Sequence, residues 1–173
     1  MKKSILIILC FFSVAAFAQK KSSGRAVAML MPTKVDTNAT GKITFRQKGE
    51  EVTMKLKISI PNRANQTVAA HIHEHPDCSN MGNNTHGHWN PTNSQHGKWG
   101  EGNFHLGDIG NIQLNKKGKG SLTITTKLWS VGTGKTNDVV GHGFIVHSGT
   151  DDYVSQPAGK AGTRISCGVI EAQ

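Results

Sequence analysis

The sequence contains one long apolar run and lacks a second. The run covers residues 5–16, two lysines precede it, and the tripeptide Ala-Phe-Ala at 16–18 fits a small-x-small cleavage site. The run is too short to span a bilayer, and Cys10 follows a leucine rather than a small residue, which argues against a lipoprotein anchor. We therefore expect a secretory signal peptide at 1–18, a single mature domain at 19–173 and no membrane anchor. Export would lead to the periplasm in a host with an outer membrane and to the extracellular medium otherwise.

Aromatic residues and blocks of basic residues are also scarce. Aromatics make up 6% of the chain, and the 20 lysines and arginines, against 11 acidic residues, are scattered without interleaved aromatics. A nucleic-acid-binding segment concentrates both kinds of residue, so we predict no nucleic-acid partner. The excess positive charge predicts a field that attracts small anions.

Cysteine is limited to three residues, of which Cys10 lies in the predicted signal peptide. Export leaves Cys78 and Cys167 as an even pair in an oxidising compartment, where bridging is expected. Closing so long a loop would stabilise the fold by about 4 to 5 kcal/mol in the chain-entropy model.

No stretch has the period of a long amphipathic helix, and no internal repeat occurs. Residues 52–60 alternate between apolar and polar side chains, which is typical of a half-buried antiparallel strand. Weaker strand signals occur at 25–31, 42–48, 67–73, 121–129, 139–147 and 164–170, separated by Gly, Pro and Asn. The pattern predicts an all-β fold, a Greek-key antiparallel β-sandwich or barrel that is immunoglobulin-like.

Two stretches interrupt the strand pattern. Residues 74–105 are rich in Gly, Asn and His and have almost no aliphatic side chains, and residues 148–163 form a shorter stretch of the same kind. A loop that long is either functional or disordered. Its histidines favour metal binding, so we expect two long functional loops that border one site.

Seven potential metal ligands accompany these loops. His71 and His73 are two apart on a predicted strand, so they share a face about 6 to 7 Å apart, although such a pair is also common as a solvated or packing feature. The loop and the later strands add His88, His96, His105, Asp108 and His147. Seven donors exceed one tetrahedral centre but fill two four-coordinate sites if one imidazole is shared.

Four motifs occur in an order and spacing that resemble the copper/zinc superoxide dismutase family over nearly the whole mature chain. They are His71-Ile72-His73-Glu74, Gly87-His88-Trp89-Asn90-Pro91, His105-Leu106-Gly107-Asp108 with Gly110-Asn111, and Gly162-Thr163-Arg164 through Cys167-Gly168-Val169-Ile170. The resemblance implies dismutation of superoxide to dioxygen and hydrogen peroxide, with one copper and one zinc ion per subunit. A homodimer is one candidate for the oligomeric state.

The resemblance also implies a role for each site residue. Copper would be bound by His71, His73, His88 and His147, and zinc by His88, His96, His105 and Asp108, so that His88 is the bridge and a proton relay. Asp151 would link a copper-ligand histidine to a zinc-ligand histidine. The alternative is that Asp151, like its neighbour Asp152, is an ordinary solvent-exposed loop aspartate. Arg164 would bind the small anion beside copper, and Cys78 and Cys167 match the family's disulfide.

Three histidines have no place in that ligand set. His75, His86 and His142 are interpreted as surface or loop residues, and His86, two residues before His88, could compete for metal. Two other functions are open. One is a periplasmic copper or zinc carrier without turnover, and the other is a zinc-only structural relative.

Overall fold

Alternating apolar residues build one long antiparallel face of the molecule. The computed structural model describes residues 23–173, so the predicted signal peptide at 1–18 lies outside the described residues. Strands β1 (Arg25–Pro32), β2 (Thr40–Lys48), β3 (Glu51–Ser59) and β6 (Lys119–Thr126) pair in that order. The inward residues of β3, which include Val52, Met54 and Leu56, are almost fully buried and form part of the core.

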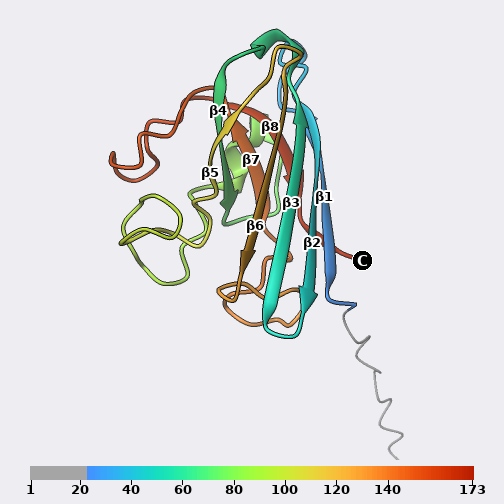
Figure 1. Cartoon of the computed structure of the whole chain (residues 1–173), viewed down its shortest axis with the longest axis vertical. Coiled ribbons are helices and arrows are strands. Elements are labelled where there is room, and N and C mark those ends of the chain that lie inside the picture. Colours follow the sequence, from blue (N-terminus) through green and yellow to red (C-terminus); the bar gives the residue numbers. More distant parts are fainter. Residues whose placement is uncertain (1–22) are drawn as a thin grey trace, which may run out of the picture.

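The remaining strands form the other side of the barrel (Figure 1). They are β4 (Thr67–His73), β5 (Gly110–Gln113), β7 (Gly143–His147), β8 (Arg164–Val169) and the short β9 (Glu171–Ala172), which pairs with β1. Within the described residues the hydrogen-bonded order is β5-β4-β7-β8-β1-β2-β3-β6. β7 and β8 from the end of the chain therefore lie between β4 and β1, a Greek-key connection that confirms the predicted fold class.

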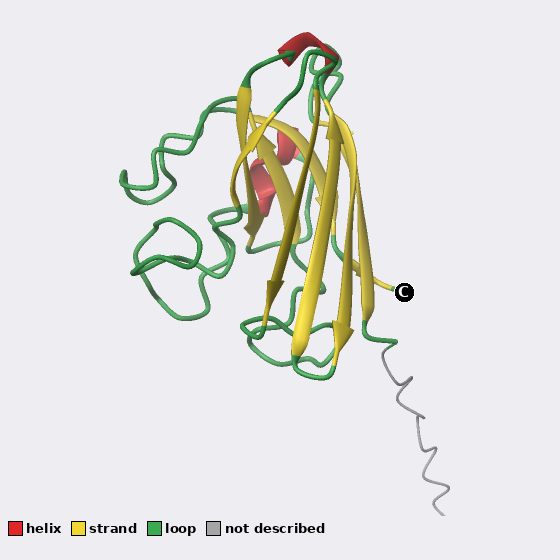
Figure 2. Cartoon of the chain, in the orientation of Figure 1, coloured by secondary structure: helices red, strands yellow, loops and turns green. Residues whose placement is uncertain are grey.

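The two predicted loops lie on the side of β4 and β5, away from the outer face of β1, β2 and β3 (Figure 1). Figure 2 shows that they are irregular apart from a short red helical segment in the first loop, η2 (Asn80–Thr85). The other 3₁₀ helix, η1 (Pro61–Arg63), connects β3 to β4. Among residues 23–173 no helix is long and apolar enough to cross a bilayer.

Two strands and two boundaries differ from the sequence prediction. β6 ends at Thr126 rather than at residue 129. β5 has four residues and β9 has two, too few to show a period, so neither was expected. β7 begins at Gly143 rather than at residue 139, because residues 139–142 form the turn that leads into it. All five residues of β7 are buried, since the strand lies in the middle of the sheet order.

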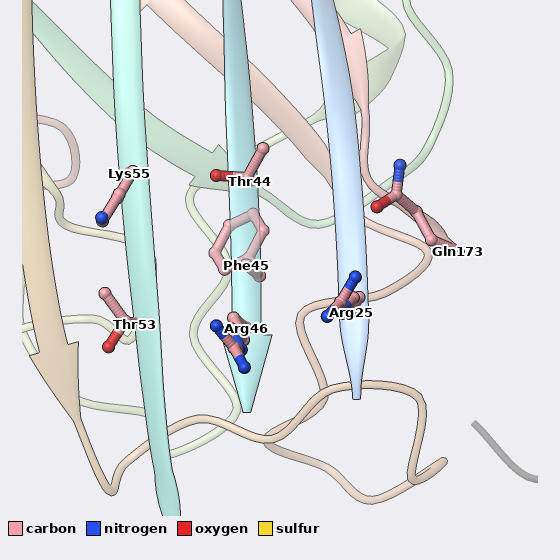
Figure 3. Close-up of a pocket in the computed structure, with 7 residues that line it drawn as sticks. All are labelled: Arg25, Thr44, Phe45, Arg46, Thr53, Lys55 and Gln173. Atoms are coloured by element: carbon pink, nitrogen blue, oxygen red, sulfur yellow. The ribbon is translucent and has the colours of Figure 1, made fainter. Parts of the chain in front are cut away.

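Basic residues that are scattered in the sequence gather on the outer face of β1, β2 and β3. Alternation sends every second side chain of these strands to solvent, and Arg25 pairs directly with Arg46 across the sheet. Figure 3 shows Arg25, Arg46 and Lys55 on three neighbouring strands, lining a hollow of about 460 Å³. The hollow contains none of the predicted site residues, so these three positive charges lie away from the histidines.

The predicted disulfide between Cys78 and Cys167 is confirmed. It has an S–S distance of 2.02 Å and joins residues 89 apart in the sequence. The bond ties the first loop, just before η2, to the middle of β8. β8 begins at Arg164, so the bond holds the loop against the strand that carries this arginine.

Replacing both cysteines by serine is expected to lower the free energy of unfolding by about 4 to 5 kcal/mol, because the unfolded chain regains the entropy of an open loop. Denaturant unfolding of the metal-free protein with and without the double substitution measures the difference. Reduction of the unsubstituted protein should reproduce the loss. A change below about 1 kcal/mol would contradict the assigned role of the bond.

Candidate metal centre

Four buried histidines from three parts of the chain meet on the face of β4 and β7 opposite the barrel core, where the loops cover them. They are His71 and His73 at the end of β4, His147 at the end of the neighbouring β7, and His88 from the first loop, and we refer to them as the first group. An isolated bridge pairs His88 with His73, which extends β4 into the loop. Each histidine offers a ring nitrogen, these atoms lie within 4.8 Å of one another, and all four residues are buried.

Backbone carbonyls orient two rings of the first group. His73 Nδ1 donates to the carbonyl oxygen of His86 (2.8 Å), and His147 Nδ1 donates to that of Gly162 (3.2 Å). These bonds assign the protons to Nδ1 and leave both Nε2 atoms as lone-pair donors. The two Nε2 atoms lie 3.3 Å apart, so they face the same point.

The other two rings of the first group carry buried nitrogens that have no hydrogen-bond partner. These atoms are His71 Nδ1 and His88 Nε2. His71 uses its other nitrogen, Nε2, to donate to Asp151 Oδ2 at 2.8 Å. A buried polar atom without a partner is costly unless something else satisfies it, and a cation shared by the four rings would do so.

The second group consists of His88, His96, His105 and Asp108, whose donor atoms also lie within 4.8 Å of one another. The Asp108 carboxylate oxygens lie 2.8 Å from His88 Nδ1, 3.0 Å from His96 Nδ1 and 3.2 Å from His105 Nδ1. The last two nitrogens are close to oxygen yet lack hydrogen-bond geometry. Three imidazoles and one carboxylate around a common centre are a typical zinc ligand set.

His88 is the only residue that belongs to both groups. Its Nε2 faces the first group without a partner, and its Nδ1 lies beside Asp108 in the second. Its ring also stacks on His71 with 3.9 Å between centroids. The structure therefore places one imidazole between two clusters of donors, as the shared-imidazole hypothesis requires.

Asp151 connects the two groups a second time. Its Oδ2 accepts from His71 Nε2, and its Oδ1 accepts from His96 Nε2 at 2.9 Å. Asn111 holds the loop here, since its side chain exchanges two bonds of 2.8 Å with the backbone of Asp151. A side chain at Gly159 would collide with the Asp151 carboxylate, which explains the glycine.

The pKa values favour neutral rings in the first group and ionised carboxylates. His96 of the second group differs, because burial would lower its pKa but Asp108 and Asp151 raise it to about 9. Burial lowers the pKa of His88 to about 4 and holds the pKa of His73 and of His147 well below the usual histidine range. Burial would raise the pKa of Asp108, but the close contacts of its oxygens with His105, His88 and His96 outweigh it and hold that pKa far below its usual range. Neutral imidazole and ionised carboxylate are the forms that bind metal.

Arg164 lies directly across from His147 in the pairing of β7 with β8, next to an irregularity in the register. Its guanidinium donates to the carbonyl oxygens of Gly82 and His86 and to Thr85 Oγ1. These three acceptors belong to the loop that the disulfide ties to β8. The arginine is half-buried, so part of its guanidinium group remains available to a small anion.

Sequence reasoning missed the residues that act through their backbone. The carbonyl of His86 holds both His73 and Arg164, and His86 adopts a φ of 60° and a ψ of −140°, which is unusual for a residue other than glycine. Gly107 was expected only as part of a motif. A side chain there would collide with the carbonyl of Ile72, and the Gly107 backbone bonds both Ile72 and Trp89. No side-chain pattern reveals such roles.

Of the three histidines outside the ligand set, His75 and His86 are exposed, as expected, and His142 is half-buried. The His142 ring packs against Trp89 and donates to the carbonyl of Glu74. None of the three belongs to either histidine group.

The fold and the site together define a Greek-key β-barrel protein with a paired metal centre. A model of the copper/zinc superoxide dismutase family (SODC) matches residues 39–170. Superoxide dismutase [Cu-Zn] 1 of Aquifex aeolicus (strain VF5) is 35% identical over 76% of this chain and 79% of its own length. The extracellular superoxide dismutase [Cu-Zn] of Caenorhabditis elegans is 30% identical over 98% of this chain and 78% of its own length. The chain belongs to the copper/zinc superoxide dismutase family, a family of oxidoreductases.

A solved structure agrees in fold. The crystal structure of the clock protein EA4 is 28% identical, covers 87% of this chain and 95% of its own length, and superposes with a TM-score of 0.74.

Replacing Asp151 by Asn is expected to weaken zinc binding by about 10- to 100-fold, because an amide cannot accept hydrogen bonds from His71 and His96 with both of its polar atoms. Competition with a chelator of known zinc affinity measures the change. Asp152→Asn is the matched control, since the exposed Asp152 carboxylate accepts hydrogen bonds from Val154 and Ser155 in its own turn. Equal effects of the two substitutions would contradict the role given to Asp151.

Proposed function

We propose that this protein is an exported copper/zinc superoxide dismutase that binds one copper ion in the first group and one zinc ion in the second. The observation that carries the proposal is the position of His88, which presents one nitrogen to each group. Copper cycling between Cu(II) and Cu(I) would supply the electron exchange that turns two superoxide ions and two protons into dioxygen and hydrogen peroxide.

The donor chemistry of the two groups supports this assignment. The first group offers four imidazole nitrogens and no carboxylate, which suits copper, whereas the second offers three imidazoles and a carboxylate, which suits zinc. Both cysteines are consumed by the disulfide, so neither is a ligand in the described chain. The carboxylate of Asp151 bonds the nitrogens of His71 and His96 that face away from the proposed ions and so orients both rings.

His88 is the residue we propose to handle a proton. Its Nε2 is buried and unpaired, so a proton held there can be passed to a bound substrate. Burial lowers the pKa of His88 to about 4, which favours release of that proton at neutral pH. Its Nδ1 stays directed at the second group, so the ring keeps its orientation while the proton moves.

Arg164 is the residue we propose to bind the anion. Its guanidinium is fixed by the first loop, its backbone pairs with His147, and its charge acts on His73 and His147, so a positive charge stands near the first group. The basic residues on the outer face of β1, β2 and β3 lie on another side of the barrel and contribute less to guidance.

Export, subunit stoichiometry and dimer formation belong to the same proposal. The signal peptide at 1–18 lies outside the described residues, and support for export comes from its sequence pattern and from the word "extracellular" in the name of the nematode relative. The destination would be the periplasm or the medium, according to the host envelope, with a homodimer as one candidate assembly and no nucleic-acid partner.

Metal analysis of protein purified without added metal, followed by superoxide consumption before and after addition of copper, tests the proposal. A dismutase would contain near-equal copper and zinc and turn over rapidly. A carrier would bind copper without turnover, and a zinc-only relative would neither retain copper nor consume superoxide. Either of these two results would overturn the proposed activity.

Replacing His88 by Ala is expected to remove most of the dependence of zinc affinity on copper occupancy, because no other ring reaches both groups and only the Asp151 carboxylate still connects them. Dismutase activity should fall with it, while folding changes less. Zinc affinity measured with and without bound copper, together with circular dichroism, checks both points. Undiminished coupling in this variant would contradict the bridging role.

The value of kcat/KM at limiting superoxide is expected to fall as ionic strength rises, because salt screens the attraction of the anion to Arg164. Arg164→Ala should lower kcat/KM and flatten this dependence. Arg46→Ala removes a cation from the outer face and serves as the control, which should keep a steep dependence. A flat salt profile in the unsubstituted enzyme would contradict guidance, though not the metal assignment.

A further inference from the structure

A third cluster of metal-ligand side chains lies on the surface, outside both histidine groups. Glu74, His75 and His86 each offer one donor atom, and these atoms lie within 4.8 Å of one another. All three residues are exposed, and the rings of His75 and His86 stand 4.5 Å apart between centroids. We refer to them as the exposed group.

Backbone pairing holds the exposed group together. Glu74 N donates to the carbonyl of Gly87 and His75 N donates to that of Thr85, both at 3.1 Å, so the end of β4 and the loop run side by side. The carbonyl of His86 is in turn fixed by His73 and Arg164. The two imidazoles and the carboxylate are therefore brought together by the fold rather than by chance side-chain motion.

We propose that Glu74, His75 and His86 form a third metal site, which binds a divalent transition-metal ion and prefers Cu²⁺ to Zn²⁺. Small side-chain rotations bring donors within 4.8 Å to the spacing of ligands around one ion. Two imidazoles and one carboxylate suit copper, nickel and zinc, and copper forms the most stable complexes of this series. The nearby Asp77, which interacts electrostatically with His86, adds negative charge that favours a cation.

The position of this site connects it to the interior. His75 is two residues from His73, and His86 is two residues from His88 and supplies the carbonyl that orients His73. An ion on the His86 ring would restrain the residue that holds both His73 and Arg164. The site is thus a surface position for copper on the same pair of segments that carries two histidines of the first group.

Equilibrium dialysis of protein already loaded with one copper and one zinc, against buffered Cu²⁺ or Zn²⁺, tests the proposal. We expect about one further equivalent of Cu²⁺, bound more tightly than Zn²⁺, and an additional electron paramagnetic resonance signal with nitrogen ligands. His75→Ala should weaken this binding by at least about tenfold, since losing a direct ligand costs no less than losing a supporting contact. Glu74→Gln should weaken it as well.

His142→Gln is the matched control, because His142 lies outside all three groups, and it should retain the extra ion. Absence of an extra equivalent, or its retention at full affinity in His75→Ala, would overturn the proposal. The interior copper and zinc contents of the same samples are counted separately, and His75 belongs to neither interior group. Failure of the proposed dismutase would therefore show as a loss of interior metal or turnover in the unsubstituted protein.

Discussion

The sharing of one imidazole between two clusters of donors is the constraint on which the rest of the site depends. His88 can face both groups only if its ring is held from the sides, and the Asp108 carboxylate at 2.8 Å and the stacked ring of His71 do this. Asp151 then ties His71 to His96, so the two groups are connected by a ring and by a carboxylate. Displacing either connection would change both groups together.

The barrel supplies what these side chains cannot provide for themselves. Pairing of β4 with β7 sets His71 and His73 beside His147, and pairing of β7 with β8 sets Arg164 opposite His147. The first loop has almost no aliphatic side chains. It packs Trp89 and Trp99 against the core, and the disulfide, backbone bonds to β4 and the guanidinium of Arg164 order the rest. The loop therefore serves the site and depends on it for its own order.

Buried metal ligands of the first group and the exposed group lie on the same pair of backbone segments. The antiparallel contact of residues 73–75 with residues 85–88 carries His73 and His88 toward the interior and His75 and His86 toward solvent. The outer face of β1, β2 and β3 shows a second case of such sorting, because alternation gathers basic residues there that are spread along the sequence. In both cases, residues that are interspersed along the sequence are separated by the fold onto different faces of the molecule.

The sequence by itself determined the strand periodicity, and hence the all-β class, and the family motifs, because apolar alternation and ligand spacing are local patterns. Residues 52–60 show the first, and the segment around His88 shows the second. Only the tertiary structure decided which nitrogen of each ring faces a neighbour, that the carbonyl of His86 orients His73, and that Gly159 makes room for Asp151. These features depend on contacts between residues far apart in the chain and on backbone atoms that every residue possesses, so no local pattern encodes them.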